Sequence, residues 1–155
     1  MKSKKSPNNV QIVNKRAKYD YDIKSTITAG VVLSGAETKS LRLGHGHLKG
    51  AFANIKDGEL WLYNATVNST NINARHLPEE QQNRARKLLV NKKELAELAA
   101  AKDQGLTIVP IKILTKGKFI KVVISVGKGM KKYDKRQKIK KRDEIRNLSR
   151  ELAKK

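Results

Sequence analysis

His45 and His47 are the residues whose type and spacing first suggest chemistry, because imidazole nitrogens bind metals. A metal site needs three or four ligands, and neither a cysteine nor a nearby acid cluster completes one here. Gly44 and Gly46 flank the first histidine, which is typical of a loop. We therefore expect a loop that holds no metal and no cofactor.

The acidic residues do not form a catalytic arrangement either. A nuclease or hydrolase needs clustered carboxylates for a metal, or a base held beside its substrate. The 14 acidic residues are dispersed along the chain and form no E-x-x-H motif. We predict that the protein is not an enzyme. RNA cleavage that a change of one acid abolishes would instead indicate a nuclease.

The basic residues suggest the binding of phosphate groups. Lys and Arg number 35, so the formal net charge is +21. Residues 1–18 hold six basic residues and no acid, and residues 128–155 hold thirteen basic residues and four acids. Basic arms on a compact body are typical of polyanion binding, because each neutralised phosphate releases condensed counterions. We predict a nucleic-acid-binding protein; the alternative is a basic surface without a ligand.

Length and composition limit the architecture. A chain of 155 residues with 38% hydrophobic content buries one modest core, so we expect one domain and a monomer. No apolar run approaches the ~18 residues of a membrane span, and no apolar signal region follows the basic N-terminus. The absence of cysteine is compatible with a reducing compartment. We predict a cytoplasmic protein that does not bind membranes.

Residues 30–43 (GVVLSGAETKSLRL) are predicted to be the central element that positions the basic residues. The run is rich in β-branched and leucine residues and is bounded by glycines, which favours one long strand. Alternation would place Glu37 and Lys39 among core positions. We expect Gly35 to mark a bulge that shifts the register and bends the strand. A long bent strand suits a small barrel.

Three further strands are predicted from local patterns before residue 68. Tyr19, Tyr21 and Ile23 alternate with acids and predict a half-buried strand. Residues 51–56 and 59–67 flank Asp57-Gly58 and predict a hairpin with a type I′ turn. Trp61 and Tyr63 share one face of this hairpin. We expect them in the core or at the barrel rim, with base stacking as the alternative.

The second half of the chain predicts a loop, a helix and two strands. Residues 68–84 are polar and are expected to be loop. Asn91 and Glu94 form a capping-box pattern that begins a helix of about three turns before Gly105. Pro110 points to a bulge or an edge in the strand 106–115. In the strand 118–126, Phe119, Lys121, Val123 and Ser125 would face outward, and the inward residues would be Ile120, Val122, Ile124 and Val126.

The predicted fold is mainly β: a small OB-like closed β-barrel with flanking short helices and a basic C-terminal tail. Residues 1–13 form a disordered basic arm, residues 14–127 the barrel, and residues 128–155 the tail. The apolar residues of the tail are too sparse to bury well, so we expect disorder in the free protein and a helix against a polyanion. Barrels of this class often bind oligonucleotides.

Four segments identify the chain as similar to a known family. Residues 35–42 (GAETKSLR) resemble its signature G-x-E-V-K-S-L-R, and residues 84–90 (RARKLLV) resemble R-x-R-K-L-L-L. Residues 14–21 (NKRAKYDY) and 127–136 (GKGMKKYDKR) match two more blocks in the same order. This is the SsrA-binding protein (SmpB) family, whose members carry tmRNA to stalled bacterial ribosomes. The chain departs from it at Thr28, where many members have Glu, and in the loop 68–84, which puts the RNA contacts there in doubt.

The resemblance implies that the barrel grips the tRNA-like domain of tmRNA. Lys39 and Arg42 would contact phosphates. Glu37 would orient a neighbouring base or basic side chain, or accept a hydrogen bond from a base edge or a ribose hydroxyl, or else pair with Lys39. Leu88 and Leu89 would support the surface from the core. The implied tmRNA-binding residues are Lys15, Arg16, Glu37, Lys39, Arg42, Lys87, Leu89 and Lys121.

For the tail, the resemblance implies a ribosomal role. It would enter the small-subunit decoding centre and the vacant mRNA channel, with Tyr133 stacked on an rRNA base and Asp134 holding the local turn. The implied phosphate-binding residues of the tail are Lys128, Lys131, Lys132, Lys135 and Arg136. The implied function is trans-translation, with alanyl-tRNA synthetase and elongation factor Tu as indirect partners through tmRNA. The alternative is a general OB-fold RNA-binding or ribosome-associated protein.

Overall fold

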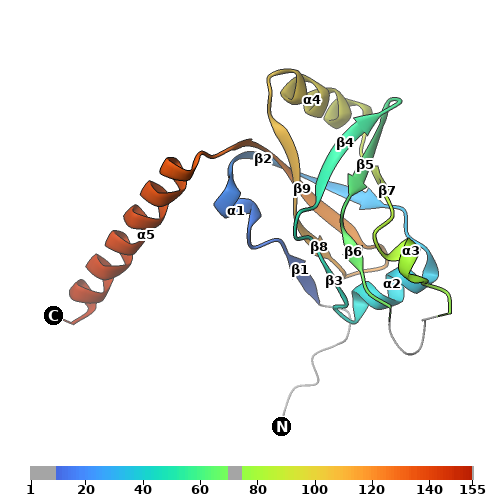
Figure 1. Cartoon of the computed structure of the whole chain (residues 1–155), viewed down its shortest axis with the longest axis horizontal. Coiled ribbons are helices and arrows are strands. Elements are labelled where there is room, and N and C mark those ends of the chain that lie inside the picture. The colour runs from blue at the N-terminus through green and yellow to red at the C-terminus, as the bar shows by residue number, and fades with distance from the viewer. Residues whose placement is uncertain (1–9, 70–74, 155) are drawn as a thin grey trace, which may run out of the picture.

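The computed structural model describes residues 10–69 and 75–154 (Figure 1). The predicted arm 1–13 therefore lies mostly outside the described residues. The strands are β1 (Gln11–Val13), β2 (Tyr21–Val31), β3 (Gly46–His47), β4 (Phe52–Lys56), β5 (Glu59–Tyr63), β6 (Thr66–Val67), β7 (Arg86–Leu89), β8 (Thr107–Leu114) and β9 (Lys121–Gly129). The helices are α1 (Ala17–Asp20), α2 (Gly35–Arg42), α3 (Glu79–Gln82), α4 (Lys92–Asp103) and α5 (Lys132–Ala153).

Seven strands form one antiparallel sheet whose pairing runs in a cycle. The order is β1-β8-β4-β5-β7-β2-β9, and β9 pairs with β8 as well as with β2. Starting from β8, the pairing passes through β4, β5, β7, β2 and β9 and returns to β8. β1 pairs with β8 outside this cycle. β4 and β8 share the shortest pairing of the cycle, in which Ala53 lies opposite Ile108. The mainly β class that the sequence predicts is confirmed.

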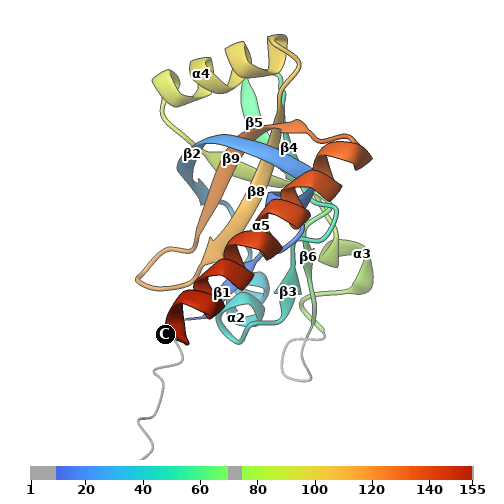
Figure 2. The same cartoon turned by 90° about the vertical axis from the view of Figure 1, so that its left-hand side faces the viewer.

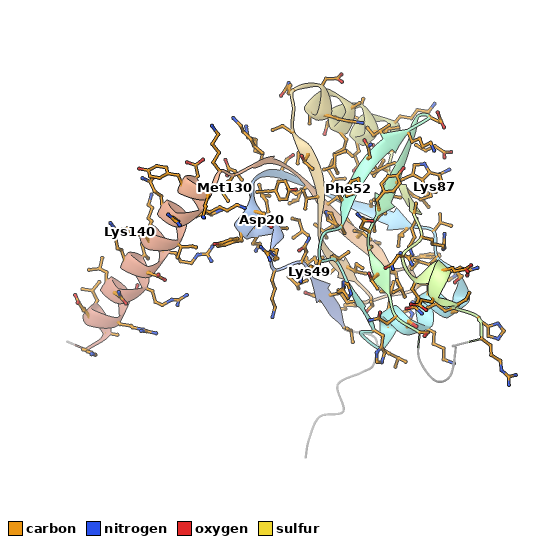
Figure 3. All side chains as sticks on the ribbon, in the orientation of Figure 1. Asp20, Lys49, Phe52, Lys87, Met130 and Lys140 are labelled. Carbon is orange, nitrogen blue, oxygen red and sulfur yellow. The ribbon has the colours of Figure 1, made fainter. Side chains whose placement is uncertain are left out.

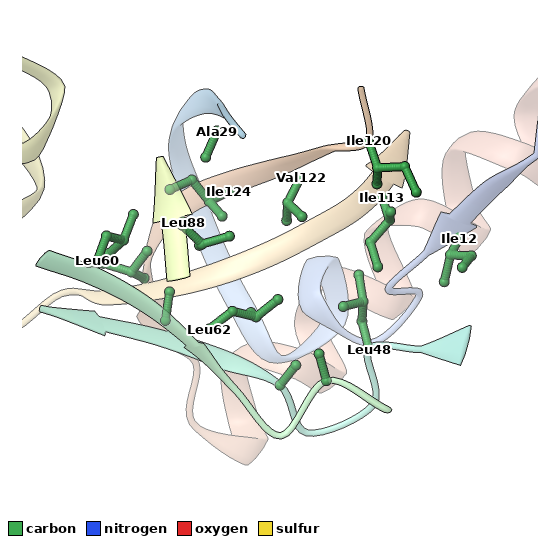
Figure 4. Packing of buried hydrophobic residues seen from close by; sticks show 14 of the residues in the cluster. Ile12, Ala29, Leu48, Leu60, Leu62, Leu88, Ile113, Ile120, Val122 and Ile124 are labelled. Atoms are coloured by element: carbon green, nitrogen blue, oxygen red, sulfur yellow. The ribbon is translucent and has the colours of Figure 1, made fainter. Parts of the chain in front are cut away.

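The inward residues of β9 form the centre of the core (Figure 4). Ile120, Val122, Ile124 and Val126 are each at most 7% exposed, which confirms the predicted alternation. Ser125 departs from it, since it is buried and its hydroxyl donates to the main-chain oxygen of Ser25 at 2.6 Å. A smaller apolar cluster of Ala17, Val109 and Ile111 covers the other side of the sheet here. The outer face of β9 is therefore only partly open to solvent.

The prediction of one long strand over residues 30–43 is wrong. β2 ends at Val31, and α2 begins at Gly35. The Ser34 hydroxyl accepts a hydrogen bond from the Glu37 main-chain N–H at 3.3 Å, and the Glu37 carboxylate accepts one from the Ser34 N–H at 3.2 Å. This capping box satisfies main-chain donors that a helix start leaves without partners. Gly35 starts a helix, and the irregularity of β2 lies between Ile23 and Ser25.

The hairpin β4–β5 is confirmed, with Asp57 at φ 53° and Gly58 at φ 75° in its turn. Both residues have the positive φ that a type I′ turn requires. The second strand is shorter than predicted, because Asn64 at φ 59° ends it. The following β6 pairs with β3 in a separate two-stranded sheet. At the start of β2, Tyr19 and Asp20 belong to α1, so this strand begins two residues later than predicted.

The predicted helix and the proline bulge are both confirmed. Asn91 and Glu94 form the capping box of α4, and Gly105 follows its end at φ 83°. The register of β8 against β9 shifts between Pro110 and Lys112, so the missing N–H of the proline falls at a bulge. The predicted loop 68–84 contains the short helix α3, and its residues 70–74 lie outside the described residues.

The helix α5 extends away from the sheet (Figures 1 and 2). It spans 22 residues, and none of them is buried. Figure 3 shows its side chains projecting on all sides of the helix. The predicted change of the tail from disordered when free to helical when bound stays a prediction. Among the described residues, no helix is long and apolar enough to span a membrane.

Candidate nucleic-acid interface

A buried carboxylate and two arginines lie behind the face formed by α2 and β7. Glu37 is 0% exposed. Arg84 donates two hydrogen bonds to its carboxylate, from Nε to Oε1 at 2.6 Å and from Nη2 to Oε2 at 2.9 Å. Arg86 is 1% exposed, and its Nε lies 3.4 Å from Oε2 of Glu37. Burial lowers the pKa of the Arg86 guanidinium, and the charge of Glu37 opposes that shift.

Arg86 also connects three segments through its remaining nitrogens. They donate to the main-chain oxygens of Ala65 at 2.7 Å, Gln81 at 3.2 Å and Gln82 at 2.9 Å. A direct contact of Glu37 with RNA and a pair with Lys39 do not fit this buried position, whereas the third role that the sequence suggested, the orientation of basic side chains, does. In the described part of the chain the ionic partners of Glu37 are Arg84 and Arg86. Lys39 itself is exposed on α2.

Arg42, the second predicted phosphate ligand on α2, is used inside the protein. Its Nη1 donates to the Thr115 oxygen at 2.9 Å, and its Nη2 donates to the oxygens of Gly117 and Lys118 at 3.1 and 3.0 Å. These contacts cross 73 to 76 residues of sequence and hold the connection between β8 and β9. These hydrogen bonds use three of the five N–H groups of the guanidinium, so a phosphate contact by the remaining N–H groups of Arg42 stays a prediction. The side chain also positions the loop that carries Phe119.

Lys121, Gly30 and Leu89 lie side by side across β9, β2 and β7. A Cβ at Gly30 would come 3.3 Å from the Leu89 Cβ, so a side chain there would crowd Leu89. Leu89 is 52% exposed, and the prediction that it supports the core is wrong, whereas Leu88 is buried as predicted. The three residues form a strip across the sheet in which Leu89 and Lys121 are exposed and Gly30 between them is half-buried.

Two exposed apolar residues extend this surface. Phe119 is 68% exposed, and the Lys118 ammonium lies 5.6 Å from its ring centroid. Val32 is also exposed, and its N–H donates to the Lys87 oxygen at 2.9 Å, which places it beside β7. Sequence reasoning missed Val32, because it was assigned to a continuing strand. The helix cap at Ser34 was the signal that the strand ends there.

Lys87 is the member of the predicted set on β7 with an ionic partner. Its ammonium lies 2.7 Å from the Glu59 carboxylate, and it sits opposite Trp61 on β5. Trp61 and Tyr63 are half-buried on the outer face of the hairpin. The Tyr63 ring stacks on Phe52 with centroids 5.3 Å apart. The two aromatics therefore lie at the rim rather than in the core.

Lys15 and Arg16 lie between β1 and α1, and both are exposed. Arg16 borders a hollow of about 410 Å³ whose wall also contains Lys49, Tyr21 and Phe52. Two cations and two aromatic rings thus face one concave surface. The nearest acid to Arg16 is Asp20, whose carboxylate lies 3.6 Å from its Nε.

The predicted tail residues lie at the junction of β9 with α5. Lys128 is on β9 opposite Asp22, and Lys131 is the N-cap residue of α5. Tyr133 is 68% exposed, and its hydroxyl accepts a hydrogen bond from Gln137 at 2.8 Å. Asp134 lies in the first helical turn, where a carboxylate interacts favourably with the helix dipole. The first turns of α5 also hold Lys132, Lys135 and Arg136.

Within residues 10–69 and 75–154, no group of three or more His, Cys, Asp and Glu residues is placed to hold a metal ion. His45 lies between α2 and β3, and His47 lies in β3. The buried ion pair of the described structure is the Glu37 carboxylate with Arg86, to which Arg84 adds a partly exposed guanidinium.

These features define a class: a small antiparallel β-sheet protein with exposed lysines on its sheet and a long basic helix attached to it. The sequence profile of the SmpB protein family matches residues 11–154. The chain belongs to the SmpB family.

Individual relatives match over most of the chain. The SsrA-binding protein of Streptococcus mutans is 42% identical over 149 residues, which cover 96% of this chain and 95% of that protein. The SsrA-binding protein of Bacillus pumilus is 43% identical over 145 residues, covering 88% and 87%. A solved chain described as "tmRNA-SmpB: a journey to the center of the bacterial ribosome" is similar with a TM-score of 0.65 and 37% identity, covering 79% of this chain and 85% of that one.

Proposed function

We propose that this protein binds tmRNA and delivers it to stalled ribosomes for trans-translation, the rescue of ribosomes and the tagging of incomplete proteins. The observation that carries the proposal is the match to the SmpB family over residues 11–154, which spans both the sheet and the basic helix. Relatives that this chain matches over most of their length carry the name SsrA-binding protein. The net charge of +21 fits a polyanionic partner.

We infer that the cyclic sheet is an OB-like barrel and that its outer surface grips the tRNA-like domain. Lys121, Leu89 and Lys39 are exposed there and supply phosphate and apolar contacts. Lys15 and Arg16 extend the basic surface at the N-terminal end. Glu37 and Arg42 act on RNA binding by positioning α2 and the β8–β9 loop, because their polar atoms are already bonded within the protein.

The tail is proposed to enter the small-subunit decoding centre and the mRNA channel that truncated message leaves empty. Tyr133 is exposed enough to stack on an rRNA base. The tail lysines and Arg136 neutralise rRNA phosphates. Alanyl-tRNA synthetase and elongation factor Tu meet the protein only through tmRNA. The protein acts as a monomer in the cytoplasm.

No bond is made or broken by this protein in the proposed mechanism. The ribosome transfers the peptide, and the protein substitutes for the missing codon–anticodon contact. The alternative, a general OB-fold RNA-binding or ribosome-associated protein, shares the charge and the sheet. It differs in predicting no preference for tmRNA over tRNA at fixed salt.

A pull-down from bacterial lysate followed by sequencing of the bound RNA tests the proposal directly. We expect tmRNA to be enriched, and competition with tRNA to leave tmRNA bound. Deletion of residues 133–155 is expected to keep tmRNA binding and to abolish tagging of stalled products. Loss of both activities together would contradict a division of roles between the sheet and the tail.

A further inference from the structure

The first half of α5 contacts the short helix α1, and the rest of α5 extends away from the protein in Figure 1 and lies in front of it in Figure 2. The Lys135 ammonium lies 3.0 Å from Oδ1 of Asp20. The Lys138 ammonium donates to the main-chain oxygen of Lys18 at 3.1 Å. Just before the helix, the Met130 N–H donates to the Asp20 oxygen at 2.9 Å, and Figure 3 shows these two residues close together.

The contact uses one face of α5. Lys135, Lys138, Ile139 and Arg142 line a narrow cleft together with Lys18 and Tyr19. The spacing of the four tail residues places them on the same side of a helix. Ile139 is 36% exposed, whereas Ile145, Leu148 and Leu152 are 58% to 63% exposed. The contact with α1 therefore ends near Arg142.

Charge complementarity holds this contact. The side chains of Lys135 and Asp20 are 26% and 28% exposed, so water screens the pair less than it would a fully exposed one. The Lys135 ammonium also lies 5.8 Å from the centroid of the Tyr19 ring, within the range of a cation–π interaction. On the α1 side, Asp20 is the carboxylate that receives both Lys135 and Arg16.

We propose that α1 is a docking site for the first half of α5, and that Asp20 and RNA phosphates compete for Lys135. Docking sets the direction in which the tail leaves the sheet and keeps residues 132–142 helical in the free protein. The predicted disorder of the free tail is then confined to the residues after Arg142. A phosphate that takes Lys135 releases the helix. The competition rests on the proposed function of the tail, but the docking does not.

Distance measurements between two spin labels in the full chain test the docking. Because the chain has no cysteine, Ala96→Cys on α4 and Lys140→Cys in the first half of α5 give two unique labelling sites, both on exposed residues. We expect a narrow distance distribution at low salt that broadens in Asp20→Asn. The ratio of docked to undocked protein should fall roughly five-fold, near the upper limit for an accessible ion pair. Asp22→Asn removes the same charge two residues away and should leave the distribution narrow.

A second variant ties the effect to this ion pair. Lys135→Gln should broaden the distribution as Asp20→Asn does, and the double variant should be no broader than either alone. A broad distribution in the unchanged chain at low salt, or additive effects of the two substitutions, would overturn the docking.

Polyuridylate serves as the probe for competition. We expect it to broaden the distribution of the unchanged chain and to add nothing in Asp20→Asn. A narrow distribution that persists at saturating polyuridylate would overturn the competition. Binding of tmRNA is measured separately on the same proteins, so a failure of the docking and a failure of the proposed function give different results.

Discussion

Arg84 and Glu37 are 47 residues apart in the chain, yet two guanidinium nitrogens of Arg84 meet the two carboxylate oxygens of Glu37 at 2.6 and 2.9 Å. This fork geometry joins the first turn of α2 to Arg84, two residues before β7. The fully buried Glu37 carboxylate also lies 3.4 Å from Nε of Arg86 and neutralises that guanidinium, which is almost inaccessible to solvent. The signature residue of α2 therefore makes its ionic contacts within the protein.

Replacing Glu37 by Gln is expected to destabilise the fold. The amide keeps the shape but leaves the buried Arg86 without a counter-charge, and breaking a buried ion pair typically costs about 3–5 kcal/mol. Urea unfolding measures the loss, with Glu97→Gln on the exposed face of α4 as the matched control. An unchanged unfolding midpoint combined with lost tmRNA binding would mean that Glu37 contacts RNA directly.

Replacing Arg42 by Lys separates its structural role from its charge. Lysine keeps the charge but cannot donate from a fork to the oxygens of Thr115, Gly117 and Lys118. We expect faster amide hydrogen exchange around residues 115–118 and a loss of roughly 1–3 kcal/mol in unfolding free energy. Arg42→Ala should behave like Arg42→Lys. If lysine restored both stability and tmRNA affinity, charge alone would explain the residue.

Leu88 and Leu89 are neighbours on β7 with opposite burial, so they form a matched pair. Leu88→Ala should cost about 2–5 kcal/mol of unfolding free energy, because it opens a cavity in the core. Leu89→Ala should change stability by less than about 0.5 kcal/mol, as is usual on a surface. Its expected effect is weaker tmRNA binding, measured by filter binding at fixed salt. Equal destabilisation by the two variants would contradict the burial pattern.

The salt dependence of tmRNA binding distinguishes phosphate contacts from other roles. Lys121→Ala should reduce the slope of log affinity against log salt by about one, the value for one lost phosphate contact. Lys93→Ala on α4 is the control, because that lysine is exposed on an element away from the Leu89 strip. An unchanged slope for Lys121→Ala would remove it from the interface.

The caps of α2 and α4 should be equally important to their helices. Ser34→Ala and Asn91→Ala each remove one capping box, and each is expected to cost about 1 kcal/mol. Thermal unfolding compares them with Lys39→Ala, a change at an exposed position inside α2 that leaves the cap intact. A cap variant as stable as the unchanged chain would mean that packing alone fixes where that helix starts.

Local patterns in the sequence determined much of the fold. Alternation in β9, the Asp57-Gly58 turn, the Asn91 cap and the bulge at Pro110 all involve interactions between near neighbours, and all are confirmed. The same local reasoning failed at residues 30–43, where an alternating apolar run overlapped a capping signal. The signal of Ser34 followed by Glu37 was present in the sequence, and the helix it starts satisfies main-chain groups that a continued strand would have left to a partner strand.

The tertiary structure alone decided what the signature residues do. Position in a motif suggested that Glu37 and Arg42 face RNA, but their partners lie 47 and more than 70 residues away. The same holds for the contact of Asp20 with Lys135, which spans 115 residues. A local pattern reports which face of an element is apolar. Whether a charged side chain on that element is exposed or neutralised depends on which distant segments pack against it, because the cost of burying a charge depends on its partners.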